Sequence, residues 1–262
     1  MNRIDERFAK VKADGRKALI TFLTVGDPNM EVSEKAIYTM QEEGVDLIEL
    51  GVPFSDPAAD GPVIQRADER ALAQGVDIFK VFELVRKIRN NVEVPMVFLL
   101  YYNVMVQYGI EKFFKCCQET GVDGLIIPDL PYEESDEIKE YTEKYGVYQI
   151  SLVSPTSKDR IKNIAKDAKG FLYCISSLGV TGEKSSFVTN FDEFVRTIKK
   201  YTDVPACVGF GVSNGKQVKE LTKYFDGAIV GSAIVKSIAT GESVEERINN
   251  LREKIKDLKS GL

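Results

Sequence analysis

The sequence of 262 residues contains no histidine and no tryptophan. Histidine is the side chain whose ordinary pKa lies closest to neutral pH, so it is the most common general acid or base. Without it, acid–base chemistry near neutrality has to come from carboxylates, lysine, tyrosine or cysteine. Carboxylates in unlike surroundings are therefore the first candidates for catalytic residues, because their environments can drive their pKa values apart.

Cysteine is also scarce, and its spacing does not suit a metal site. The four cysteines are Cys116, Cys117, Cys174 and Cys207, and no two of them form a CxxC pair. With no histidine to complete a ligand set, we expect no bound metal in this chain. Buried, reduced thiols fit the pattern better, and they are typical of a reducing cytosol.

Long apolar runs and an excess of basic charge are missing as well. No run approaches the ~18 residues that a membrane-spanning helix needs. The first 17 residues alternate charges of both signs without an apolar signal-peptide core, so we expect a cytoplasmic protein that contacts no membrane. The net charge of −5 disfavours a nucleic-acid partner. It remains compatible with a small anionic ligand, because backbone N–H groups can bind anions locally.

What the chain does contain is a repeated pattern of short apolar strand, Gly/Pro/Asp-rich loop and amphipathic helix. Eight such units predict an α/β fold, a (β/α)8 TIM barrel that forms a single domain over residues 1–262. An extra N-terminal helix with Ile4, Phe8 and Val11 on one face is expected to close the lower end of the barrel. The predicted strands are Leu19–Thr24, Leu47–Leu50, Met96–Tyr101, Gly124–Pro128, Tyr148–Val153, Phe171–Ser176, Ala206–Phe210 and Gly227–Val230.

Helix start and stop signals support this alternation. Asp27 followed by Pro28 predicts an N-cap with a proline in the first turn, and Asp77 predicts the cap of a later helix. Helices are expected to end at Gly44, Gly75 and Gly146.

The segment 48–62, IELGVPFSDPAADGP, places two carboxylates in unlike surroundings. Glu49 is the penultimate residue of an apolar strand, and its neighbours Ile48 and Leu50 point to the opposite face. If these neighbours pack outward, Glu49 projects into the barrel mouth, where barrels of this kind place their active sites. Asp60 follows on a Gly/Pro-rich loop. Apolar neighbours predict a raised pKa for Glu49, since burial disfavours the ionised form.

Glycines gather in the last three units of the pattern. The segments 178–182, 209–213 and 231–233 read LGVTG, GFGVS and GSA. Glycines let backbone N–H groups approach an anion closely, and a helix N-terminus adds a partial positive charge. Loops after the last two strands are the usual phosphate site of such barrels, so the sequence predicts phosphate binding there. No lysine stands at a predicted strand end, which disfavours a Schiff-base aldolase.

Several of these motifs resemble the tryptophan synthase α subunit family, collinearly from about Arg3 to Leu258. Two positions depart from the pattern: Ala58 stands where a bulkier apolar residue is expected, and Ser177 where some relatives carry arginine. The matching segments are IELGVPFSDPAADGP at 48–62, YYNVMVQYG at 101–109, SSLGVTG at 176–182, VGFGVS at 208–213 and VGSAIV at 230–235.

The resemblance implies a lyase that splits indole-3-glycerol phosphate into indole and glyceraldehyde 3-phosphate by a retro-aldol reaction. It implies that Glu49 is the acid–base group at indole C3 and the side-chain hydroxyl, and that Asp60 accepts the indole N–H. The implied phosphate contacts are Thr181, Gly182, Gly211, Gly231 and Ser232. The implied indole pocket is lined by Phe22, Leu100 (or Leu99), Tyr102 (or Tyr101), Tyr173 and Phe210.

The resemblance also implies a partner, the tryptophan synthase β subunit, in an α2β2 heterotetramer. Pyridoxal phosphate is expected in that partner, and no cofactor is expected in this chain. The surface presented to the partner would include Asp56, the segment 103–108 beginning with Asn103, Asp129 and Pro131. The polar loop 178–190 is expected to close as a lid over the phosphate.

Other interpretations remain open. Glu49 can be half of a buried structural ion pair, Asp60 can belong to a solvated acidic loop, and the aromatic residues can be ordinary barrel core. The chain can also be another phosphosugar enzyme that shares the glycine anchor, or a non-catalytic subunit that binds ligand and regulates a partner. A lyase that works without a partner is a further variant.

Overall fold

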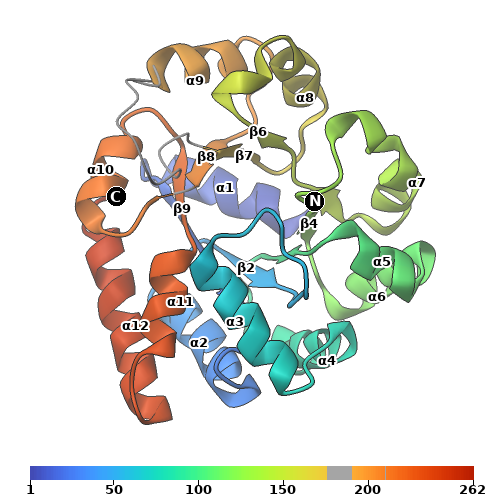
Figure 1. Cartoon of the computed structure of the whole chain (residues 1–262). Coiled ribbons are helices and arrows are strands. Elements are labelled where there is room, and N and C mark those ends of the chain that lie inside the picture. The colour runs from blue at the N-terminus through green and yellow to red at the C-terminus, as the bar shows by residue number, and fades with distance from the viewer. Residues whose placement is uncertain (176–190, 210) are drawn as a thin grey trace.

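The computed structural model describes residues 1–175, 191–209 and 211–262. Helices and strands alternate along the chain, and the strands form one parallel sheet in the order β5-β4-β3-β2-β1-β9-β8-β7-β6 (Figure 1). None of the described helices is long and apolar enough to span a membrane.

The described strands are β1 (Ala18–Thr24), β2 (Leu47–Gly51), β3 (Met96–Leu99), β4 (Gly124–Ile126), β5 (Tyr148–Gln149), β6 (Leu152–Val153), β7 (Leu172–Ile175), β8 (Ala206–Gly209) and β9 (Gly227–Val230). The described helices are α1 (Arg3–Ala13), α2 (Met30–Glu42), α3 (Pro62–Ala73), α4 (Ile78–Ile88), α5 (Tyr102–Tyr108), α6 (Ile110–Thr120), α7 (Asp136–Tyr145), α8 (Ile161–Asp167), α9 (Phe191–Lys199), α10 (Gly215–Leu221), α11 (Ser232–Ala239) and α12 (Val244–Lys259). Short 3-10 turns lie at Arg89–Asn91, Tyr132–Glu134 and Pro155–Arg160.

The sheet closes through an interrupted strand. β5 pairs with β4 and β6 pairs with β7, and only Ile150 and Ser151 separate β5 from β6. The Ile150 N–H donates to the carbonyl of Leu125 at 2.8 Å, while the Ser151 carbonyl accepts from the N–H of Tyr173 at 3.0 Å. The backbone thus passes from one neighbouring strand to the other at this point. The predicted (β/α)8 barrel is confirmed, with its fifth strand divided in two.

The barrel has two apolar cores that follow the alternation of its strands. Residues such as Ile48 and Leu50 point outward and pack against the surrounding helices. Residues on the other face fill the barrel interior, where Ile4, Phe8 and Val11 of α1 pack against them. In Figure 1 α1 is seen through the middle of the barrel, so the predicted closure of the lower end by the N-terminal helix is confirmed.

One of the two helix-cap predictions is wrong. Asp77 does cap α4, accepting from the N–H of Lys80 at 3.0 Å. The N-cap of α2, however, is Asn29 and not Asp27, since the helix begins at Met30. The Asp27 carboxylate is buried and accepts hydrogen bonds from Nε and Nη2 of Arg70 in α3, at 2.7 and 3.0 Å. These bonds connect the loop between β1 and α2 to α3. Helices do end shortly before Gly44, Gly75 and Gly146, as predicted.

Three aspartates hold the amino ends of the strands in register. Asp46, Asp123 and Asp226 each directly precede a strand, and each accepts a backbone N–H from the beginning of a neighbouring strand. The donors are Leu19 at 3.0 Å, Met96 at 2.9 Å and Ala206 at 2.8 Å, respectively. Each carboxylate also pairs with a cation, Arg16, Arg3 and Lys199 in the same order.

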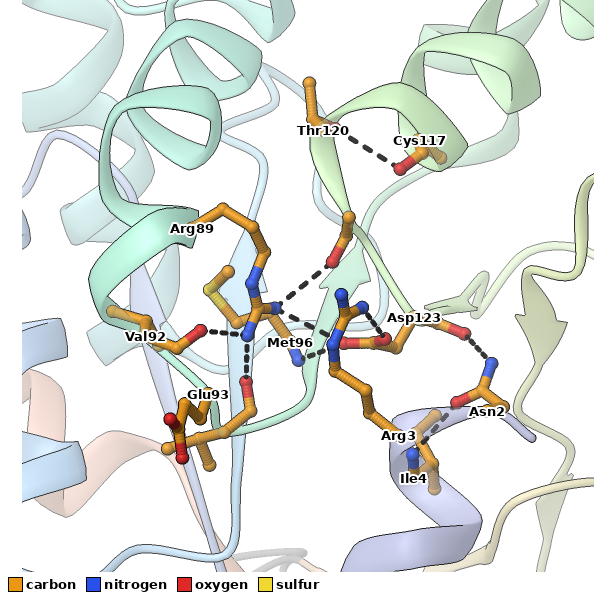
Figure 2. Close-up of polar contacts among 12 residues, drawn as sticks. Asn2, Arg3, Ile4, Arg89, Val92, Glu93, Met96, Cys117, Thr120 and Asp123 are labelled. Carbon is orange, nitrogen blue, oxygen red and sulfur yellow. Dashed lines mark hydrogen bonds and ion pairs between the residues drawn. The ribbon is translucent and has the colours of Figure 1, made fainter.

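The Asp123 network is the most extensive of the three (Figure 2). Arg3 from α1 donates to Asp123 at 2.8 Å, and Arg89 approaches the other carboxylate oxygen at 3.5 Å. Arg89 also donates to the carbonyls of Val92, Val94 and Gly121, which joins the end of α4 to the end of α6. These bonds lie at the amino ends of the strands, opposite the end where barrels of this kind carry their sites.

Candidate active site

The carboxyl ends of the strands surround a cavity of about 1040 Å³. Its wall combines residues from several strands and from the loop before α3. The predicted site residues that line it are Phe22, Glu49, Asp60, Tyr173, Gly211, Gly231 and Ser232. Thr181, Gly182, Phe210 and the predicted lid 178–190 lie outside the described residues.

Glu49 projects into this cavity from β2, as the alternation of the strand predicts. Its neighbours Ile48 and Leu50 pack in the outer core, so the Glu49 side chain takes the inner face. Across the sheet it is in register with Phe22 of β1 and Val97 of β3. Two strands therefore fix its backbone, and its apolar neighbours keep it away from water.

The carboxyl group of Glu49 has unusual electrostatics. The residue is 1% exposed, and its Oε1 atom has no hydrogen-bond partner among the described residues. Burial raises the pKa of Glu49 to about 8, in agreement with the sequence-based expectation. Among the described residues Glu49 forms no ion pair, so the structural ion-pair interpretation has no support there. At neutral pH this carboxyl group holds a proton that it can donate into the cavity.

Asp60 is held at the cavity edge by Tyr101. The Tyr101 hydroxyl donates to Asp60 Oδ2 at 2.7 Å and accepts the backbone N–H of Ala59 at 2.9 Å. The Tyr101 ring is stacked on Phe54, with ring centroids 5.0 Å apart. Burial raises the pKa of Asp60, while the hydrogen bond from Tyr101 acts in the opposite direction. The loop acid therefore has a fixed position, which a freely solvated loop would not give it.

A third acid at this end, Asp68, was missed by sequence reasoning. It lies on α3, is 4% exposed, and accepts a hydrogen bond from the Thr24 hydroxyl at 3.1 Å. Burial and then the charge of Asp60 raise the pKa of Asp68 to about 7. In the sequence it stands within the charged run ADER, which is typical of an exposed helix face. Nothing in that local pattern distinguishes it.

Two aromatic rings cross the barrel mouth because glycines stand opposite them. A Cβ atom at Gly51 would lie 2.5 Å from Cζ of Phe22, and one at Gly209 would lie 2.6 Å from the Tyr173 hydroxyl. Neither distance is compatible with a side chain. Gly51 and Gly209 therefore create the space for the rings. Glycine at a strand end indicates that another group approaches closely, but it does not indicate which group.

Two predicted pocket residues lie elsewhere. Leu100 is fully buried in the outer core, and its neighbour Leu99 lines the cavity instead. Tyr102 donates its hydroxyl to Glu137 at 2.6 Å and does not line the cavity. The preceding Tyr101 is the tyrosine that reaches Asp60. In both pairs the residue earlier in the chain, Leu99 or Tyr101, faces the site, because successive residues point in opposite directions at the end of β3.

The predicted phosphate end of the cavity is formed by Gly211, Gly231 and Ser232. Gly211 has a left-handed backbone with φ of 77°, which favours glycine. The first hydrogen bonds of α11 run from Ile234 and Val235 to the Gly231 carbonyl, so the amide of Ser232 precedes the helical ladder. Such amides, together with the helix dipole, make this end suited to an anion.

The residues predicted to face a partner lie at this rim, three of them on loops and Asn103 in the first turn of α5. Asp56, Asn103, Asp129 and Pro131 all have exposed side chains. Asp129 also accepts the backbone N–H of Tyr102 at 2.9 Å, which fixes the start of α5. Among the residues that the structure describes, no group of three or more histidine, cysteine or acidic residues is placed to hold a metal ion.

Comparisons with known proteins match the chain to one family. The family model of the tryptophan synthase alpha chain matches residues 8–262. A tryptophan synthase alpha chain from Thermoanaerobacter sp. (strain X514) is 48% identical, with 100% of both chains covered. One from Methanocaldococcus jannaschii is 47% identical over 90% of this chain and 84% of its own length.

Solved structures give the same result. The Legionella pneumophila tryptophan synthase subunit alpha has a TM-score of 0.84 and 34% identity, with 98% of this chain and 99% of that chain covered. The Mycobacterium tuberculosis tryptophan synthase in its open form has a TM-score of 0.88 and 32% identity, with 99% and 98% covered. The chain belongs to the tryptophan synthase alpha chain family, whose members are the subunit that cleaves indole-3-glycerol phosphate in tryptophan biosynthesis.

Proposed function

We propose that Glu49 and Asp60 carry out the retro-aldol cleavage in this chain. Protonation of indole C3 turns the ring into an electron sink. The bond between C3 and the glycerol side chain then breaks, its electron pair returns to the ring, and the adjacent hydroxyl loses its proton to become the aldehyde. The products are indole and glyceraldehyde 3-phosphate. The reaction therefore needs one group that first gives and then takes a proton.

Glu49 is suited to that double role. Its pKa of about 8 keeps the carboxyl group protonated at neutral pH, so it can protonate C3. Once ionised, the same group is a strong base in an apolar environment and accepts the hydroxyl proton as the bond breaks. The free Oε1 atom supports this assignment, because no described residue competes for it.

Asp60 is suited to stabilise the positive charge that develops on the ring. The hydrogen bond from Tyr101 favours its ionised form and leaves its other oxygen for the indole N–H. The ring would lie among Phe22, Leu99 and Tyr173. A fixed negative charge at this position stabilises the transition state more than the neutral substrate.

The phosphate would bind at the opposite side of the cavity. Gly211, Gly231 and Ser232 supply its described contacts, and the sequence adds Thr181 and Gly182. This anchor holds the glycerol chain so that C3 faces Glu49. Positioning of this kind removes much of the entropic part of the barrier.

The unpartnered, buried carboxyl of Glu49 is the observation that carries the proposal, and Glu49→Gln tests it. The substitution keeps size and shape but removes the transferable proton, so we expect indole release to fall by ~10²–10⁴-fold. Affinity for glyceraldehyde 3-phosphate should be retained. Unchanged turnover would move the chemistry elsewhere and favour another phosphosugar reaction. Absence of turnover in the wild-type chain, with ligand binding intact, would favour the regulatory-subunit alternative.

The family name implies a β-subunit partner, and we propose an α2β2 heterotetramer with pyridoxal phosphate in the β subunit. Indole is neutral and apolar and would escape by diffusion, so direct delivery to a partner is advantageous. The exposed rim residues Asp56, Asn103, Asp129 and Pro131 are the proposed contacts. Faster indole release with added β subunit, reduced by Asp56→Ala, would support this surface. Sedimentation of the mixture measures the stoichiometry.

We also propose that residues 1–262 form a single cytoplasmic domain. The strands on both sides of the barrel pair into one sheet, and the four cysteines are buried free thiols, as a reducing compartment would keep them. A single transition in calorimetry would support one domain, and fractionation of the source cells would test the location.

A further inference from the structure

The lining of the active-site cavity continues beyond the phosphate end onto α11 and α12. Each helix contributes one face to this part of the wall. On α11 the lining positions recur with helical spacing, at Ser232, Ala233, Lys236, Ser237 and, just past the helix end, Thr240; on α12 they are Asn250 and Lys254. Figure 1 shows the two helices side by side at the edge of the barrel.

The charges of the cavity are divided between its two ends. Among the described lining residues, Glu49 and Asp60 are the acids, and Lys236 and Lys254 are the cations. The catalytic acids lie on the β2 side, whereas both lysines lie on the helices that follow β9. Glu49 is uncharged at neutral pH, so the two lysines attract an anionic ligand to the second end, and an ionised Asp60 repels it from the first.

Each lysine lies close in the fold to a residue of the predicted phosphate position. Lys236 follows Ser232 by one turn on the same helix face, and helical side chains lean toward the helix N-terminus. Its ammonium group has no hydrogen bond or ion pair with any described residue. Lys254 donates to the carbonyl of Ser213 at 3.2 Å, which holds it beside the loop that follows Gly211, and it also pairs with Asp257 at 3.2 Å.

We propose that Lys236 and Lys254 determine specificity by drawing phosphate monoesters into the cavity and by discriminating against uncharged analogues. The backbone amides at Gly211 and Ser232 orient a bound phosphate, but they carry no full charge. The two ammonium groups supply that charge. Lys236 contributes more than Lys254, because Asp257 neutralises part of the second charge. This inference rests on the proposed position of the phosphate.

The expected effect is on capture of the substrate and not on the chemical step. Charged clefts raise association rates by about 10–10³-fold. Loss of one of two cations should then lower kcat/KM for indole-3-glycerol phosphate by ~3–10-fold at low ionic strength, with kcat unchanged. Added salt should reduce the difference, since it screens charges at an open surface.

The test compares Lys236→Gln and Lys254→Gln with Lys115→Gln. Lys115 is an exposed residue of α6 that does not line the cavity, so its replacement removes the same net charge elsewhere. We expect a loss of kcat/KM for Lys236→Gln, a smaller loss for Lys254→Gln and none for Lys115→Gln. Lys236→Arg should restore the value. The dephosphorylated substrate, indole-3-glycerol, should be turned over equally by all variants.

Titration of the chain with inorganic phosphate separates this proposal from the proposed catalytic roles. Its dissociation constant should rise by ~3–10-fold in Lys236→Gln and stay constant in Lys115→Gln, whether or not indole is released. Equal losses for the charged and uncharged substrates would overturn the proposal, since the lysine would then be structural. An unchanged phosphate affinity in both cavity variants would also overturn it.

Discussion

Glu49→Gln should stabilise the folded chain increasingly as the pH rises. Burial raises the pKa of Glu49 from 4.5 in its reference state to about 8 in the folded chain. Between these values the unfolded chain releases a proton that the folded chain retains. The folded state therefore loses stability as the pH rises through this window, and the loss is complete above the folded pKa. Glutamine cannot ionise, so the variant does not lose this folding stability as the pH rises.

The size of the effect follows from the two pKa values. One pKa unit corresponds to about 1.4 kcal/mol, so the whole window corresponds to about 5 kcal/mol. Between pH 5 and pH 9 about 4 kcal/mol of this is realised, because the titration is already under way at pH 5. That is a large part of the unfolding free energy of an ordinary domain, which is about 5–15 kcal/mol.

Urea unfolding at several pH values and constant ionic strength measures this quantity. The difference in unfolding free energy between Glu49→Gln and the wild-type chain should grow by about 4 kcal/mol from pH 5 to pH 9. Glu83→Gln is the matched control, because it removes the same charge from the exposed face of α4. A difference that stays constant with pH would refute the reasoning, since Glu49 would then titrate alike in both states.

Three further predictions concern the support of the site. Gly51→Ala should destabilise the fold by ~1–3 kcal/mol and depress indole release, because the new Cβ meets Phe22 at 2.5 Å; urea unfolding and an indole assay check both effects. Tyr101→Phe removes the hydrogen bond that holds down the pKa of Asp60, so the acidic limb of the pH profile of kcat/KM should move to higher pH; an unmoved limb would contradict the assignment. Asp123→Ala should lower the unfolding free energy by ~3–5 kcal/mol, since it leaves the largely buried Arg89 and the buried Met96 N–H without this carboxylate; a loss below 1 kcal/mol would mean that water replaces the carboxylate.

The fold could be predicted from the sequence because its signals are local. Apolar runs, helix periodicity and strand-to-helix order determine a parallel barrel, and each predicted strand corresponds to one or two described segments. The break between β5 and β6 could not be predicted. It arises where Ile150 bonds to one neighbouring strand and Ser151 to the other, a requirement of closing the sheet that leaves no mark in the residue types.

The positions proposed as catalytic acids were predictable for the same reason, whereas their surroundings were not. Glu49 interrupts an apolar strand and is conspicuous in the sequence. Asp68 belongs to a charged helical run, and its burial depends on contacts with Thr24 that lie far away in the chain. The choice between Leu99 and Leu100 depended on the strand register, because a shift of one residue exchanges the two faces.

The two ends of the barrel use the same acidic side chains in opposite ways. At the amino end, Asp46 and Asp123 are buried, and each accepts a strand amide and pairs with arginine, so the barrel is held together there. At the carboxyl end, Glu49 and Asp68 are also buried but have no cation partner among the described residues, and burial raises the pKa of both. A cation beside Glu49 would stabilise the ionised carboxylate and so remove the loss of folding stability at high pH. It would also lower the pKa of Glu49, which could then no longer donate a proton at neutral pH. The stability supplied at the first end therefore permits the unpaired carboxyl group of Glu49 that the proposed reaction requires at the second.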